Sequence, residues 1–111
     1  MFVRIYTDSD GQSHFEDLTV AMGQPGRSPM QAAVGISFNR AEPGHFMDWH
    51  NAPRRQYVII LAGLFEITIG DGTKRRMGPG DVLLAEDLIG KGHTTRTVGN
   101  ETRLSATIPL A

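Results

Sequence analysis

The sequence contains no cysteine among its 111 residues. This absence excludes disulfide bonds, thiolate metal sites and thiol nucleophiles. Long hydrophobic runs are also lacking, since the longest nearly apolar stretch covers only residues 57–65 and the N-terminal segment has no apolar stretch of signal-peptide length. We therefore expect a cytoplasmic protein.

An excess of charge of one sign is absent too. The chain has 11 Lys and Arg residues against 12 Asp and Glu residues, and its formal net charge is −1. Such a balance provides no general attraction for nucleic acid or for an anionic membrane surface. We therefore expect a small molecule as the partner, and neither nucleic acid nor a membrane.

Glycine, by contrast, is abundant, with 13 residues, and 6 prolines accompany it. Residues of these two types break helices and form tight turns, so their number favours many short strands over a helical bundle. The chain length is typical of one folded unit, and we expect a single domain over residues 1–111.

Short apolar or alternating segments, separated by turn residues, predict a series of strands. No segment has the pattern of a long amphipathic helix, so the predicted fold class is all-β, as a sandwich or a barrel. Residues 23–30 are expected to form a loop, because prolines and glycines interrupt any ladder of hydrogen bonds there. The predicted strands are 2–6, 13–20, 33–39, 56–62, 64–69, 73–77, 82–86, 93–98 and 102–110.

The histidines carry the most informative chemistry, because the chain has no thiolate. Residues separated by an even number share one face of a strand. If a strand runs unbroken through residues 48–56, then Asp48, His50 and Gln56 point the same way. His93 begins a later strand and reaches the same cavity if the sheet closes on itself.

Two segments resemble the two sequence motifs of the cupin family. Residues 44–63, GHFMDWHNAPRRQYVIILAG, have the spacing of the first motif, which places a glycine, a His-x-His pair, a glutamate and a closing glycine in that order. Residues 80–97 resemble the second motif, with its histidine at His93. The resemblance implies a jelly-roll barrel, also called a double-stranded β-helix, that holds a divalent metal ion in its mouth. It also implies a homodimer.

The resemblance implies metal ligands at His50, Gln56 and His93, although the motif is degenerate. Ala52 replaces the second histidine of the pair and Gln56 replaces the glutamate. Imidazole suits Zn, Fe, Ni and Cu and, less tightly, Mn. We predict that such an ion binds these three residues. The alternative is a metal-free cavity in which the same groups bond to each other or to water.

Other polar residues near these motifs are candidates for catalysis or for substrate binding. His14 and Glu16 share a face of one predicted strand, and together with Asp48 they are the candidates for proton transfer. Arg54 is the candidate clamp for a substrate carboxylate, and Tyr57 is the second candidate substrate-binding residue. The alternatives are an exposed strand for the first pair, a turn cap or a surface pair for Asp48 and Arg54, and packing for Tyr57.

Three functional hypotheses follow from these residues. The first is a metal-dependent enzyme of lyase, isomerase or dioxygenase type that acts on a small organic molecule. The second is a metal-free module that binds a small ligand without catalysis. The third is a structural dimer whose barrel is filled by side chains.

Overall fold

The computed structural model of the protein describes residues 1–19 and 26–111. The last residue of the strand predicted for 13–20 and residues 23–25 of the predicted loop lie outside the described residues. The described residues form ten strands and no helix, which confirms the all-β prediction. The strands are β1 (Phe2–Thr7), β2 (Ser13–Asp17), β3 (Ser37–Ala41), β4 (Phe46–His50), β5 (Gln56–Ala62), β6 (Leu64–Thr68), β7 (Lys74–Met77), β8 (Val82–Glu86), β9 (His93–Val98) and β10 (Arg103–Pro109).

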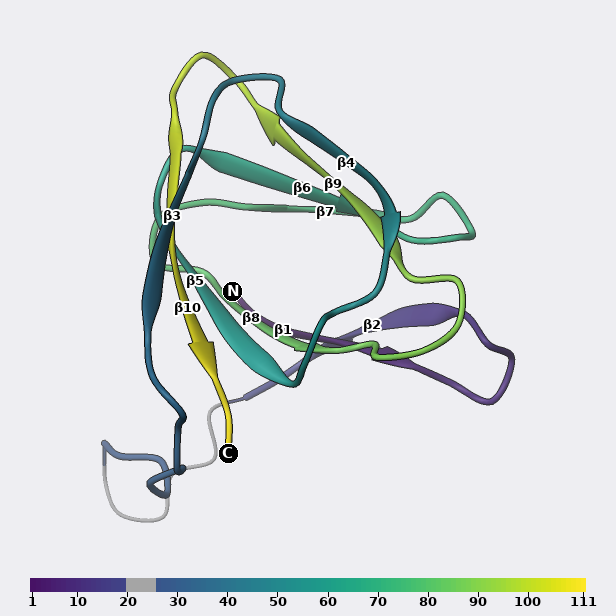
Figure 1. Cartoon of the computed structure of the whole chain (residues 1–111), viewed down its shortest axis with the longest axis vertical. Coiled ribbons are helices and arrows are strands. Elements are labelled where there is room, and N and C mark those ends of the chain that lie inside the picture. Colours follow the sequence, from purple (N-terminus) through teal and green to yellow (C-terminus); the bar gives the residue numbers. More distant parts are fainter. Residues whose placement is uncertain (20–25) are drawn as a thin grey trace.

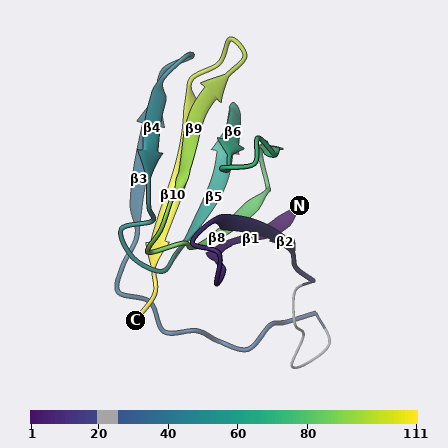
Figure 2. The same cartoon turned by 90° about the vertical axis from the view of Figure 1, so that its right-hand side faces the viewer.

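The strands form two sheets that enclose the interior of the molecule. One sheet has six strands in the order β2-β1-β8-β5-β10-β3, and the other has four in the order β4-β9-β6-β7. In Figure 1, β3 and β10 run along the left side, the four-stranded sheet lies above, and β5, β8 and β1 lie below. Figure 2 shows β3 and β4, each an edge strand of its sheet, at the same side of the molecule.

The turn between β5 and β6 requires glycine at position 63. Gly63 has a φ of 77°, in the left-handed region, where a side chain is strained. A Cβ atom there would lie 2.9 Å from both the Arg103 Cα atom and the Thr102 carbonyl oxygen. The start of β10 therefore packs directly against the turn between β5 and β6, and this contact fixes the position of the Arg103 backbone.

The strand predicted for residues 33–39 is shifted in the structure, where β3 runs from Ser37 to Ala41. Pairing with β10 sets the two ends of β3, because Ser37 pairs with Thr107 and Ala41 pairs with Arg103. Ala33 makes only an isolated bridge, to Leu110.

The hydrophobic core fills one part of the interior. Its fully buried side chains come mainly from β1, β5, β6 and β7, and they pack between the two sheets. The largest of them are Val3, Ile5, Ile60, Ile67 and Met77. By contrast, β3 and β4 are mostly exposed, so the interior beside them stays open. No helix in the described part of the chain has the length and apolarity needed to cross a membrane.

Candidate functional site

A cavity of about 380 Å³ occupies the part of the interior that the core leaves open. Its wall is built by side chains from both sheets, with apolar groups such as Val58, Phe65 and Leu83 on one side. His50, Gln56 and His93 all line this cavity, so the structure brings together the three residues that the motifs predict as ligands. A larger hollow of about 560 Å³ lies elsewhere and is mainly apolar, with Phe2, Tyr57 and Ile59 in its wall.

His50 and His93 face each other across paired strands. They are register partners on β4 and β9, and their ring centroids lie 4.5 Å apart at an interplanar angle of 61°. The glycine before His93 permits this arrangement, because a Cβ at Gly92 would lie 2.2 Å from the His50 carbonyl oxygen. The backbone of the chain entering β9 therefore packs directly on the end of β4.

Each of the two imidazoles is held at its Nδ1 atom. His93 Nδ1 donates to the Asp87 carboxylate at 2.5 Å, and His50 Nδ1 donates to the Asp48 carbonyl oxygen at 2.7 Å. No hydrogen bond joins either Nε2 atom to another described residue. Because the other nitrogen carries the proton, Nε2 of each ring keeps its lone pair and can bind a metal ion.

Asp87 lies directly behind His93 and is fully buried. Its Oδ2 atom accepts from Ser13 Oγ at 2.8 Å as well as from His93, while Oδ1 has no partner among the described residues. A buried carboxylate is costly unless positive charge compensates it. A cation bound at the Nε2 atom of His93 would supply such a charge. The sequence held a signal for this residue, because Asp87 continues the inward row of Leu83 and Ala85.

Gln56 opens β5 beside the two imidazoles. It pairs with Ala85 on β8, is half-buried and lines the cavity next to Val58. Ala52, which replaces a motif histidine, is 6% exposed and lines the same cavity without offering a donor atom. Accordingly, no group of three His, Cys, Asp or Glu residues within 1–19 and 26–111 is placed to hold a metal.

The residues present nevertheless suit a divalent ion. Two imidazoles with free Nε2 atoms and one amide oxygen form a neutral donor set, and the buried Asp87 carboxylate supplies nearby negative charge that the ligands lack. A carboxylate bonded to the distal nitrogen of a histidine is the usual outer partner of a metal-bound imidazole. The donor set fits Zn, Fe, Ni, Cu or Mn better than Mg or Ca, which prefer oxygen ligands.

The expected common face of Asp48 and His50 is wrong. Strand β4 ends at His50 and β5 begins at Gln56, so the strand does not run through residues 48–56. A register shift between Met47 and His50 turns both of these side chains into the cavity, despite their odd separation. Asp48 is therefore absent from the cavity wall, and its Oδ1 atom accepts from the backbone N–H of Trp49 at 2.9 Å.

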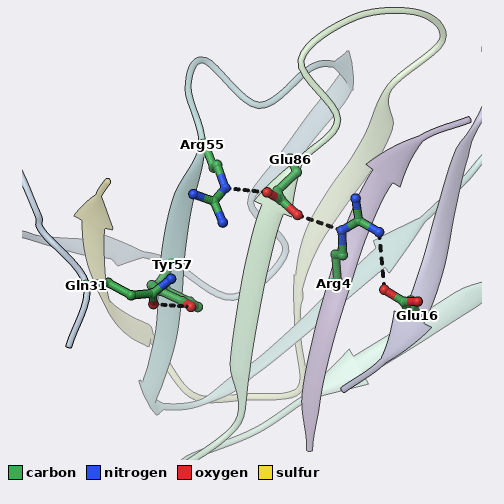
Figure 3. Close-up of polar contacts among 6 residues, drawn as sticks. All are labelled: Arg4, Glu16, Gln31, Arg55, Tyr57 and Glu86. Atoms are coloured by element: carbon green, nitrogen blue, oxygen red, sulfur yellow. Dashed lines mark hydrogen bonds and ion pairs between the residues drawn. The ribbon is translucent and has the colours of Figure 1, made fainter. Parts of the chain in front are cut away.

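The other candidate residues lie outside the cavity as well. Arg54 is exposed in the segment between β4 and β5. Tyr57 points to the opposite face of β5 from Gln56, where its hydroxyl donates to Gln31 at 2.5 Å (Figure 3). This side of the sheet is the outer face.

His14 and Glu16 also face outward, because β2 pairs with β1 at the edge of the six-stranded sheet. His14 lies beside Asp10, with 2.8 Å between Nε2 and Oδ2, and Glu16 accepts from Arg4 at 3.2 Å (Figure 3). The structure therefore bears out the alternative of an exposed strand for this pair and not the role in proton transfer at the cavity, since the inward row of β1 holds Val3 and Ile5.

Two cavity residues were missed by sequence reasoning. His45, which was not among the candidate residues, lines the cavity near the start of β4. Arg103, at the start of β10, lines it from the six-stranded sheet. Its Nε donates to Thr97 Oγ1 at 3.3 Å, and its guanidinium carbon lies 4.3 Å from the centre of the Phe65 ring. The available signal was alternation, because Arg103 lies opposite the apolar row that begins at Leu104.

No protein-family model matches this sequence. No curated protein matches it either.

Solved structures do match the fold. A cupin superfamily protein from Desulfitobacterium hafniense is 23% identical, with a TM-score of 0.56 over 75% of this chain and 72% of that one. A protein with a double-stranded β-helix domain from Klebsiella pneumoniae is 20% identical, with a TM-score of 0.53 over 80% and 76%. A DMSP lyase from Ruegeria pomeroyi is 22% identical, with a TM-score of 0.58 over 81% of this chain but 44% of that one.

These similarities define the fold of the chain. It has the double-stranded β-helix, or jelly-roll, fold of small cupins, as the two motifs predict. Sequence identities of this size show a shared fold but do not show a shared activity.

Proposed function

We propose that the protein binds a divalent metal ion in the inner cavity through His50, His93 and Gln56, and acts on a small organic molecule held beside it. The observation that carries this proposal is the pair of facing imidazoles, each tied at Nδ1 and free at Nε2. Histidines that bind metals characteristically donate their other N–H in this way.

The chain's own residues would orient and enclose the reactants. Asp87 holds the His93 ring, the Asp48 carbonyl holds the His50 ring, and Phe65 supplies part of an apolar wall that limits access of water. When bound, a metal ion would supply Lewis-acid polarisation of a substrate oxygen, or affinity for dioxygen. Lyase, isomerase and dioxygenase chemistry are all compatible with such a site, and one protein that shares the fold is named as a lyase.

A second candidate function is a metal-free module that binds a small ligand. The observation that favours it is Ala52, which fills a usual donor position with a methyl group in the cavity wall. In that case the His93–Asp87 hydrogen bond orients the ring, and the ligand bonds to the free nitrogens of the two rings.

Metal content separates the two candidates. We expect protein purified with zinc present to retain about one equivalent after gel filtration, since two imidazoles and an amide provide three ligands. His93→Ala should lose that zinc, whereas His14→Ala, which removes a histidine from the outer face, should keep it. Zinc below about a tenth of an equivalent in the wild type, unchanged by supplementation, would leave the metal-free module as the better account.

We also propose that two copies of the chain associate as a homodimer. Within the described residues β3 pairs only with β10, and it presents an open edge with Phe38 65% exposed. An exposed edge carrying apolar side chains is a template for pairing with another chain. Light scattering should give twice the chain mass, and Phe38→Lys should give a monomer. A wild type that stays monomeric at high concentration would contradict the proposal.

A further inference from the structure

Among the described residues, the wall of the inner cavity includes Arg103 and three histidines but neither Asp nor Glu. Arg40 also borders the cavity, but it is the register partner of Leu104, on the outward row, and its side chain is 72% exposed. Asp87 lies behind the wall, bonded to Nδ1 of one imidazole. The permanent charge in the wall is therefore the positive charge of Arg103, which favours an anionic ligand.

Arg103 is the buried element of this positive surface. The phenyl ring of Phe65 lies under its guanidinium group, Nε donates to Thr97 and Nη1 donates to Ser105 Oγ at 3.5 Å. These hydroxyl contacts are long and neutral, and no acceptor among the described residues bonds to Nη2. Burial lowers the pKa of Arg103, yet a guanidinium remains charged at neutral pH. Arg103 is thus a half-buried cation without a counterion in the protein.

The other arginines of the described chain differ from Arg103 in this respect. Arginines that are partly buried have carboxylate partners, such as Arg4 with Glu86 and Arg75 with Asp17. Arginines without such a partner are exposed to water, which solvates their charge. This second group comprises Arg27, Arg54 and Arg96. Among the arginines of the described residues, Arg103 alone is partly buried and has no carboxylate partner.

We propose that Arg103 binds the carboxylate of a small organic acid inside the cavity, with the hydrocarbon part of the acid against Phe65, Val58 and Leu83. This inference deepens the proposed function, on which it rests for the use of the cavity as a substrate site. A planar guanidinium presents two parallel N–H donors that match the two oxygens of a carboxylate, and here Nη2 is without a partner among the described residues while Nη1 has only the long contact to Ser105. Bound there, the acid neutralises the charge that the protein leaves uncompensated.

A carboxylate fits this environment better than a phosphate group does. A phosphate dianion needs several donors or more than one cation, whereas the buried part of the cavity offers one guanidinium beside apolar side chains. The volume of about 380 Å³ is near the lower limit for ligand pockets, which suits a small acid rather than a large one.

Titration of the protein with matched acids and amides tests this assignment. The protein is first stripped with a chelator, and benzoate, succinate and pyruvate are then titrated in by calorimetry, with benzamide as the neutral counterpart of benzoate. We expect saturable binding of at least one acid, and roughly a tenfold preference for acid over amide because a charge-assisted pair is lost in the amide.

Variants then identify the anchor. Arg103→Gln should weaken binding of the acid about tenfold, while Arg103→Lys should weaken it less, because lysine keeps the charge and loses the fork. Arg96→Gln is the matched control, since Arg96 is exposed and absent from the cavity wall, and it should change affinity less than about twofold. The Nε–Hε resonance of Arg103 should also shift during titration of the wild type, a readout that needs no variant.

Three results would overturn the inference. They are no saturable binding of any of the three acids, equal binding of benzoate and benzamide, or unchanged binding by a folded Arg103→Gln. Zinc binding is measured separately on the same preparations. Acid binding without zinc binding would refute the proposed metal site and leave the anion site standing, whereas zinc binding without acid binding would do the reverse.

Discussion

The outer face of the six-stranded sheet and the inner cavity contain charged residues in opposite arrangements. On the outer face, Glu86 accepts hydrogen bonds from Arg4 at 2.6 Å and from Arg55, and Arg4 also reaches Glu16 (Figure 3). In the cavity, Arg103 and the free nitrogens of His50 and His93 have no carboxylate partner in the wall. The charged residues of the outer face therefore pair with one another, whereas the charge of Arg103 in the cavity has no opposite charge beside it.

This difference separates residues that stabilise the fold from residues available to a ligand. Exposed ion pairs contribute about 0–1 kcal/mol each and need no further partner. A partly buried cation or a free imidazole nitrogen instead loses solvation without gaining a partner, and a ligand restores the missing interaction. We therefore expect a ligand to bind in the inner cavity, where it can pair with polar groups that have no partner in the protein.

The largest expected effect comes from restoring the absent donor. Ala52→His places a third imidazole in the cavity wall, and we expect zinc affinity to rise roughly a hundredfold, as a fourth ligand completes the set. Competition with a chelator of known affinity measures the change. Ala33→His, in an exposed segment, is the control and should leave affinity unaltered. An unaltered affinity in Ala52→His would show that zinc does not bind at this cluster.

The buried carboxylate behind His93 should have the next largest effect. Asp87→Asn removes negative charge but keeps the shape of the side chain, and we expect zinc affinity to fall about tenfold. Asp48→Asn is the matched control, because only the backbone of Asp48 orients His50. Equal affinity in Asp87→Asn and wild type would mean that the carboxylate does not support the ligand.

A smaller effect is expected from the outer face. Burial acts to raise the pKa of Glu86, but hydrogen bonds from Arg55 and Arg4 outweigh it, so the pKa is lowered below its ordinary 4.5. A lowered folded-state pKa adds stability that is present above the unfolded-state value and is lost as the pH falls through the folded-state value.

Urea unfolding at two pH values tests the direction of this change in stability. From pH 6 to pH 3, the wild type should lose about 1 kcal/mol more unfolding free energy than Glu86→Gln does. Zinc binding and acid binding by Glu86→Gln should stay unchanged at neutral pH, because the side chain belongs to the outer face. Identical acid sensitivity of the two proteins would contradict the assigned role of Glu86.

The smallest effect is expected at Arg54. This side chain is exposed and absent from the cavity wall, so Arg54→Gln should leave zinc affinity, acid affinity and stability within experimental error. A large loss of acid binding would return the anion-binding role from Arg103 to Arg54, the candidate clamp named from the sequence.

Motif spacing predicted the fold and the grouping of His50, Gln56 and His93, because spacing between turn glycines fixes which strand positions meet. It did not predict the orientation of Asp48, since a bulge reverses the alternation within β4. Such a bulge depends on the partner strand, and the partner is not encoded locally.

Strand β10 was predicted as a strand over residues 102–110, but its alternating pattern does not say which row of side chains faces inward. The apolar row that includes Leu104 and Ile108 lies outside, while Arg103 and Ser105 line the cavity. A binding cavity inverts the usual rule, because polar side chains are placed inside to meet a ligand.

A zinc titration shows whether His50 and His93 form a metal site. Zinc is titrated by calorimetry into chelator-stripped wild type and into a His50→Ala/His93→Ala double variant whose fold is verified by circular dichroism. We expect one saturable site in the wild type and none in the double variant. The absence of a saturable site in the wild type, or an equal site in the folded double variant, would contradict a metal site at these two histidines.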